Sequence, residues 1–122
     1  KNARKGNKMK LKEFYREIGS SYADVTARLG NEEFVRYFVL LFKDDKSFEE
    51  LKESLKKGLA ADAFRAAHTL KGVAANLGFS ALYENAAEIT EALRGGDLNA
   101  AAALFPALEE KYSKVIAAAE GL

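Results

Sequence analysis

Residues 61–78 read ADAFRAAHTLKGVAANLG, and this stretch decides the fold. Its apolar side chains recur at alternating spacings of four and three residues, the period of an α-helix with one buried side. Gly78 stands where a helix often ends, because glycine adopts the left-handed conformation of a C-terminal cap without strain. The pattern predicts a helix from about Ala61 to Leu77. Its expected buried stripe consists of Ala63, Ala67, Leu70, Ala74 and Leu77.

Helical patterns also fill the rest of the chain. Two short amphipathic stretches precede this helix, and longer ones lie on both sides of it. The short stretches cover about 11–18 and 22–29, and the longer ones cover about 31–42, 47–58, 80–95 and 97–119.

Polar residues at the expected helix starts predict N-terminal caps. Asn31, Ser80 and Asp97 each stand at the start of an amphipathic run. Ser47 stands three residues before Glu50, which is the spacing of a capping box. In the run after Asn31, the residues expected to be buried are Phe34, Val35, Phe38, Leu41 and Phe42.

Several amphipathic helices with short connections predict an all-α fold. We expect an antiparallel, up-down four-helix bundle over residues 10–122, with short additional N-terminal helices packed across it. Residues 1–9 begin with four basic side chains in eight positions and show no hydrophobic period. We expect this segment to be a disordered linker or an expression remnant, and a basic arm for membranes or nucleic acid is the alternative.

Composition narrows the function. A chain of 122 residues, 48% hydrophobic and 30% charged, is one soluble globular domain. With no cysteine and one histidine it offers no thiolate or multi-histidine metal site, so we expect no metal. No nucleotide-binding glycine loop and no membrane-length apolar run is present. The net charge is +1 and the first eight residues hold +4, so the other 114 carry −3, which argues against nucleic-acid binding.

The single histidine, His68, stands opposite the buried stripe of its helix. At ~100° per residue it points ~160° away from Leu70. A lone histidine is more often a surface or satisfied core residue, but most residues around this one are small. Those neighbours are Ala61, Gly72, Ala75 and Asn76, with Phe64 and Arg65 one turn back.

Three features of this side predict a phosphoryl site. An imidazole is partly uncharged near neutral pH and can act as a nucleophile. Lys71 can reach an anion attached to the ring of His68, and Gly72, which costs about 1 kcal/mol relative to alanine in a helix, leaves room beside it. No carboxylate on a neighbouring turn can act as a base. We therefore expect no independent enzyme, and the phosphoryl donor and any Mg²⁺ should come from another protein.

Residues 67–78, AHTLKGVAANLG, resemble the signature of histidine-containing phosphotransfer (HPt) domains, and the resemblance covers most of residues 11–120. It implies that His68 accepts a phosphoryl group on Nε2, that Lys71 steadies the phosphoryl oxygens and that Gly72 gives access. It also implies that the partners are response-regulator receiver domains, with a hybrid sensor histidine kinase as a further candidate. We expect a cytoplasmic monomer without a cofactor of its own.

Residues around the motif are candidates for partner docking. They are Ala61, Phe64, Arg65, Ala75 and Asn76. An equal alternative for Phe64 is a position half-tucked against the neighbouring helix. An equal alternative for Arg65 is a solvated surface charge. For the whole chain, one alternative is a degenerate HPt-like module that docks receiver or kinase partners without phosphotransfer. Another is an unrelated structural bundle.

Overall fold

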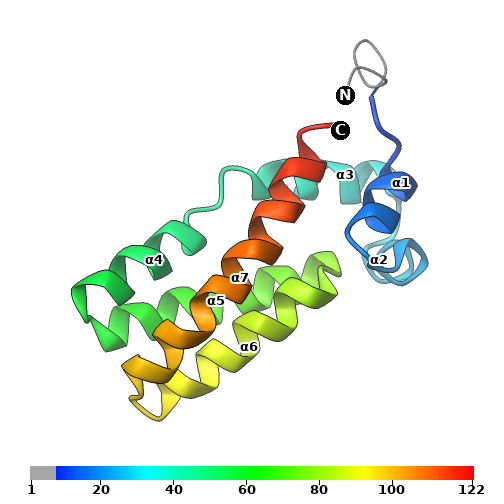
Figure 1. The fold of residues 1–122 in the computed structure, drawn as a ribbon. Helices are drawn as coiled ribbons and strands as arrows, with labels where there is room; N and C mark the ends of the chain where they lie inside the picture. Colours follow the sequence, from blue (N-terminus) through cyan, green and yellow to red (C-terminus); the bar gives the residue numbers. More distant parts are fainter. Residues whose placement is uncertain (1–7) are drawn as a thin grey trace.

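The computed structural model describes residues 8–122, and this part of the chain contains seven α-helices and no β-strand (Figure 1). The all-α prediction is confirmed. The helices are α1 (Leu11–Glu17), α2 (Tyr22–Leu29), α3 (Glu32–Phe42), α4 (Ser47–Lys57), α5 (Ala60–Leu77), α6 (Ser80–Arg94) and α7 (Leu98–Ala119).

The last four helices form the bundle. Short turns centred on Gly58, Gly78 and Gly95–Gly96 join them, so consecutive helices run in opposite directions (Figure 1). Each helix packs against the next one in the chain, and α7 also contacts α4, which closes the bundle. None of the helices in residues 8–122 is both long and apolar enough to cross a lipid bilayer.

The apolar stripe of α5 faces the centre of the bundle. All five of its predicted residues are buried, including Leu70 with no exposed surface. Its alanines carry small side chains, so neighbouring helices can approach this side of α5 closely. The stripe on α6 that faces it is also buried and consists of Leu82, Ala86, Ile89 and Leu93.

The short helices α1 and α2 pack at the end of the bundle where α5 ends and α6 begins. The last carbonyl groups of a helix lack partners within the helix. Here the hydroxyl of Tyr15 donates to the carbonyl oxygen of Leu77 at 2.5 Å. Nη2 of Arg28 donates to the carbonyl oxygens of Ala75 and Asn76 at 3.1 and 3.2 Å. The N-terminal helices thus cap the C-terminus of α5.

One end of the predicted linker belongs to the fold. Residues 1–7 lie outside the described part of the chain, so the structure does not test the prediction there. Met9, however, is buried, and its N–H donates to the carbonyl oxygen of Gly121 at 2.7 Å. The expected disorder is therefore wrong for Met9, whose side chain joins the core beside the end of α7.

Two of the predicted helix caps are confirmed and two are wrong. The side chains of Asn31 and Asp97 accept backbone N–H groups of α3 and α7 at 2.8 and 2.9 Å. Ser47 is instead the first residue of α4, and its N–H and hydroxyl both donate to Oδ1 of Asp45. Ser80 is the first residue of α6, and its N–H donates to Oγ of Ser20 at 3.2 Å.

The predicted buried side of α3 is partly wrong. Val35 and Phe42 are buried and Phe38 is half-buried, but Phe34 and Leu41 are 46% and 44% exposed. The reason is that α3 packs at one end of the bundle, against α2 and α5, so only a narrow side of it is covered. The α3 ridge, which we define as Phe34, Tyr37 and Leu41, lies outside that side.

Candidate functional site

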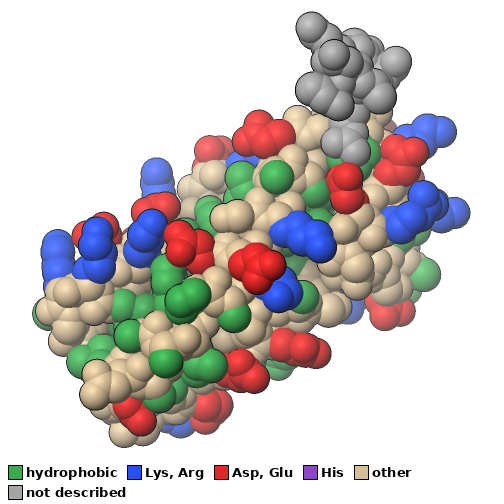
Figure 2. All heavy atoms as spheres, in the orientation of Figure 1, with side chains coloured by type: hydrophobic (Ala, Val, Ile, Leu, Met, Phe, Trp, Pro, Cys, Tyr) green, Lys and Arg blue, Asp and Glu red, His purple; other side chains and the backbone are tan. Residues whose placement is uncertain are grey.

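His68 lies in the middle of α5 and its side chain is exposed, as the helical phase predicts. Its neighbour Ala67 and the residue two further on, Leu70, are fully buried, so the backbone under the imidazole is held by the core. Figure 2 shows the face on which α4 and α7 lie in front, and no imidazole is visible there. The site therefore occupies a different side of the bundle.

Gly72 leaves open space one turn beyond His68. It has an ordinary helical backbone, and a Cβ atom added to it would meet no heavy atom within 4 Å. No neighbouring helix comes close enough to require a glycine at this position. Gly78 differs, because its φ is +74° and an added Cβ would lie 3.4 Å from both Nη2 of Arg28 and Cβ of Val25. The left-handed φ thus accounts for the glycine at position 78, whereas neither the backbone conformation nor a close neighbour requires a glycine at position 72.

Lys71 supplies a positive charge one turn from His68. Its side chain is half-buried, and its ammonium group makes no hydrogen bond or ion pair with another residue of the described chain. Such an ammonium remains available to an anion on the same side of α5.

Within residues 8–122, no three acidic or histidine side chains converge in a way that could hold a metal ion.

Phe64 borders the imidazole and is half-buried, which agrees with the alternative that it is tucked towards the neighbouring helix. Its ring centroid lies 5.8 Å from that of His68, and the two planes are tilted by 35°. Arg94 of α6 places its Cζ 5.1 Å from the Phe64 centroid, over the ring. Arg94 could not be identified from the sequence, because a single sequence does not show which residue of α6 stands opposite Phe64.

The remaining predicted docking residues all reach the surface. Ala61, Ala75 and Asn76 are exposed on the same side of α5 as His68. Arg65 is exposed as well, and its guanidinium pairs with the carboxylate of Asp62 one turn back. This pairing leaves Arg65 as a partly neutralised surface charge.

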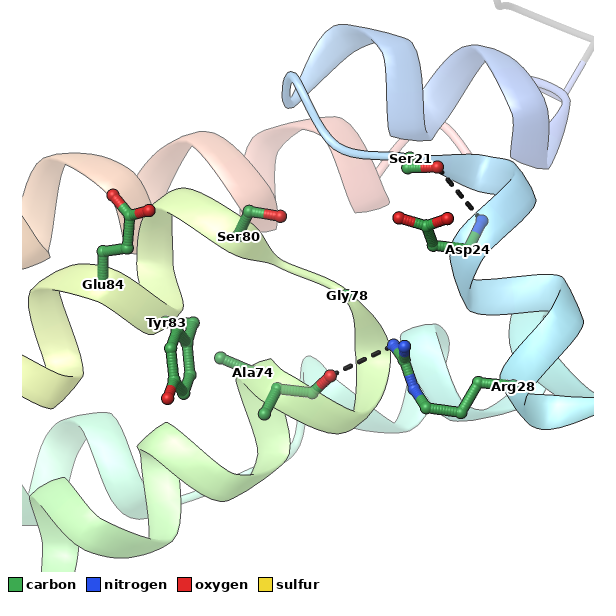
Figure 3. Close-up of a pocket in the computed structure, with 9 residues that line it drawn as sticks. Ser21, Asp24, Arg28, Ala74, Gly78, Ser80, Tyr83 and Glu84 are labelled. Atoms are coloured by element: carbon green, nitrogen blue, oxygen red, sulfur yellow. Dashed lines mark hydrogen bonds between the residues drawn. The ribbon is translucent and has the colours of Figure 1, made fainter.

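Two hollows flank the C-terminal half of α5. One, of about 360 Å³, lies between α2, α5 and α6, and the side chain of Arg28 reaches across it to the end of α5 (Figure 3). The other, of about 380 Å³, lies between α3 and α5 and includes Phe34, Leu41 and Val73 in its walls. Asn76, an expected docking residue, lines this second hollow. The exposed apolar surface of α3 therefore adjoins the side of α5 that carries His68.

A family model for the Hpt domain matches residues 42–118, which span nearly all of α4 to α7 and more than half of the chain. The chain belongs to the Hpt domain family. Hpt domains are phosphotransfer carriers of two-component signalling that interact with receiver domains and histidine kinases, and they are not ATP-using enzymes. Comparisons with curated proteins and with solved structures gave no match.

Proposed function

We propose that this chain is a phosphorelay carrier in which His68 takes a phosphoryl group from the aspartate of one receiver domain and passes it to another. The observation that carries the proposal is the exposure of His68 beside the open space at Gly72. A receiver must bring its phosphoaspartate into line with a ring nitrogen, and bulky side chains around the imidazole would prevent this approach. The family match supplies the general role, and the residue assignments are ours.

The proposed transfer is a direct displacement at phosphorus. The lone pair on Nε2 of His68 attacks, the N–P bond forms, and the P–O bond to the aspartate breaks with its electrons, leaving a carboxylate on the receiver. Nδ1 keeps its proton, so the ring becomes a phosphorylated imidazolium that can release this proton to water. The reverse displacement delivers the phosphoryl group to the next receiver. Mg²⁺ belongs to the receiver in this proposal, and no cofactor belongs to this chain.

Lys71 would lower the energy of the transferred group electrostatically. Three phosphoryl oxygens share the negative charge during transfer, and a cation one turn along the helix reduces the cost of placing that charge on α5. Its ammonium makes no ion pair within the described residues, so it can meet the oxygens without breaking an existing contact.

Receiver docking would use the small exposed residues of α5 together with the α3 ridge. Ala61, Ala75 and Asn76 permit close approach, and the hollow that Asn76 shares with Phe34 and Leu41 continues this surface onto α3. Apolar side chains exposed next to a reactive group favour a protein partner over a small substrate. We place the carrier in the cytoplasm, where receiver domains would reach it, and we expect it to act as a monomer.

The experiment is a transfer assay with the purified chain. A receiver domain labelled on its aspartate in the presence of Mg²⁺ is mixed with the wild-type chain or with His68→Gln. Phosphoramidate, a small phosphoryl donor, is tested in parallel because it needs no cognate receiver. We expect acid-labile, alkali-stable label on the wild-type chain alone. Receiver binding without transfer would instead support a docking module, and label on His68→Gln would refute the assignment of the acceptor.

A further inference from the structure

Arg94 connects the last turn of α6 to the ring that borders His68. Its Nε donates to both carboxylate oxygens of Glu91 at 3.2 and 3.3 Å, and its Cζ lies 5.1 Å from the centroid of Phe64. Phe64 in turn lies 5.8 Å from His68, centroid to centroid. A series of three contacts thus leads from Glu91 on α6, through Arg94 and Phe64, to the imidazole of His68 on α5.

We propose that Arg94 is a positioning residue for the phosphoacceptor and acts through Phe64. Glu91 fixes the guanidinium, the guanidinium holds the face of the Phe64 ring by a cation–π interaction, and the Phe64 ring restricts the imidazole of His68. This inference rests on the proposed function for its kinetic consequence. Its structural consequence, the restriction of the imidazole, requires no phosphoryl transfer.

His68 needs a neighbour that restricts its rotamers because its side chain is exposed. An exposed side chain on a helix exchanges between rotamers within nanoseconds, and only some of them direct a ring nitrogen at an incoming phosphoryl group. Neither Ala75 nor Gly72 on the exposed side has a side chain long enough to limit this motion. Among the described residues, Phe64 is the ring that contacts His68. Holding Phe64 therefore raises the fraction of His68 that is ready to react.

Nuclear magnetic resonance tests the restriction without any partner. A phenyl ring 5.8 Å away shifts the carbon-bound protons of the imidazole through its ring current, and Phe64→Leu defines the spectrum without this effect. We expect Arg94→Met, which keeps the unbranched apolar stem and removes the charge, to move the His68 resonances towards those of Phe64→Leu. Arg94→Lys retains a cation and should keep most of the wild-type shift. Resonances in Arg94→Met equal to those of the wild type would overturn the proposal.

Transfer kinetics test the consequence. The rate from a labelled receiver is measured against receiver concentration for the wild type, Arg94→Met, Arg94→Lys and the control Arg16→Met in α1. Since an exposed cation–π interaction is weak, we expect the maximal rate of Arg94→Met to fall about twofold to fivefold. The half-saturating concentration should stay unchanged, and lysine should restore most of the rate.

The outcomes separate this inference from the proposed function. A raised half-saturating concentration with an unchanged maximal rate would make Arg94 a docking residue and refute positioning. If the wild type and Arg16→Met took up no label from any donor, the proposed function would fail, and the resonance shifts would still decide whether Arg94 orders the imidazole. Thermal unfolding of each variant shows that the comparison is made between folded proteins.

Discussion

The hydroxyl of Tyr15 donates a hydrogen bond to the carbonyl oxygen of Leu77, which lies 62 residues further along the chain. The phenol is fully buried, and its partner is the last residue of α5. Burial disfavours the phenolate and raises the pKa of Tyr15 above its ordinary value, although the positive charge of Arg28 opposes this effect. The tyrosine therefore enters the fold as a neutral donor that fastens α1 to the end of the helix carrying His68.

Tyr15→Phe should lower the free energy of unfolding by about 1–2 kcal/mol near neutral pH, because a buried carbonyl loses its donor. Above about pH 10 the unfolded state releases the tyrosine proton while the native state keeps it, so this contribution to stability decreases as pH rises. The difference between wild type and variant should therefore narrow at alkaline pH. Urea unfolding at about pH 8 and about pH 10.5 measures it, and a difference that is constant or widens would contradict the assigned pKa shift.

Gly72→Ala should stabilise the protein by about 0.5–1 kcal/mol, because alanine favours a helix and the added methyl group meets open space. Gly72→Gln should remain folded and transfer phosphate much more slowly, since the larger side chain crowds the approach to His68. Thermal unfolding and transfer rate are measured on the same samples.

Gly78→Ala provides the matched control for Gly72→Ala. Its φ of +74° lies in the left-handed region, which costs an alanine side chain strain that glycine avoids, so the same substitution should be destabilising by about 1–2 kcal/mol. Destabilised Gly72 variants that transferred at the normal rate would show that Gly72 serves packing rather than access.

His68→Gln should abolish phosphate uptake and change the melting temperature little, because an exposed side chain contributes little to packing. Circular dichroism and thermal unfolding measure the stability, and labelling by a phosphorylated receiver measures the uptake. A loss of several kcal/mol in stability would mean that the imidazole is buried in solution, contrary to its position here.

Asp97→Ala should cost about 1 kcal/mol, since its carboxylate accepts the N–H of Ala100 at the start of α7. Ser80→Ala at the start of α6 should change the stability by less than about 0.5 kcal/mol, because this hydroxyl caps no N–H group. Urea unfolding of both variants compares the two helix starts directly. Equal losses would show that local sequence rather than the observed geometry determines the caps.

The sequence predicted those features that depend on neighbours within one helix. The buried stripe around Leu70, the exposure of His68 and the glycine that ends α5 all follow from helical period and from backbone conformation. The N-terminal cap that Asp97 forms could be predicted in the same way, because its partner Ala100 lies three residues away. Interactions along a single helix therefore determine the α5 side of the candidate site.

Features that depend on contacts between different helices could not be predicted from the sequence. The N–H of Ser80 donates to Oγ of Ser20, which lies 60 residues earlier, so no local sequence motif could predict that contact. The exposure of Phe34 and Leu41 follows from how little of α3 the bundle covers, and an apolar period cannot show the width of the buried side. The position of Arg94 over Phe64 likewise depends on how α6 crosses α5.

The hydrogen bond from Met9 to Gly121 brings the two ends of the described chain together. Residues 8–122 could consequently be spliced into a surface loop of a host protein with both junctions adjacent, a configuration that folded domains tolerate well. Joining the two ends by a short linker and cutting the exposed turn at Gly95–Gly96 would produce a circular permutant. In it the helix that bears His68 would remain covalently continuous with the segments that cap it.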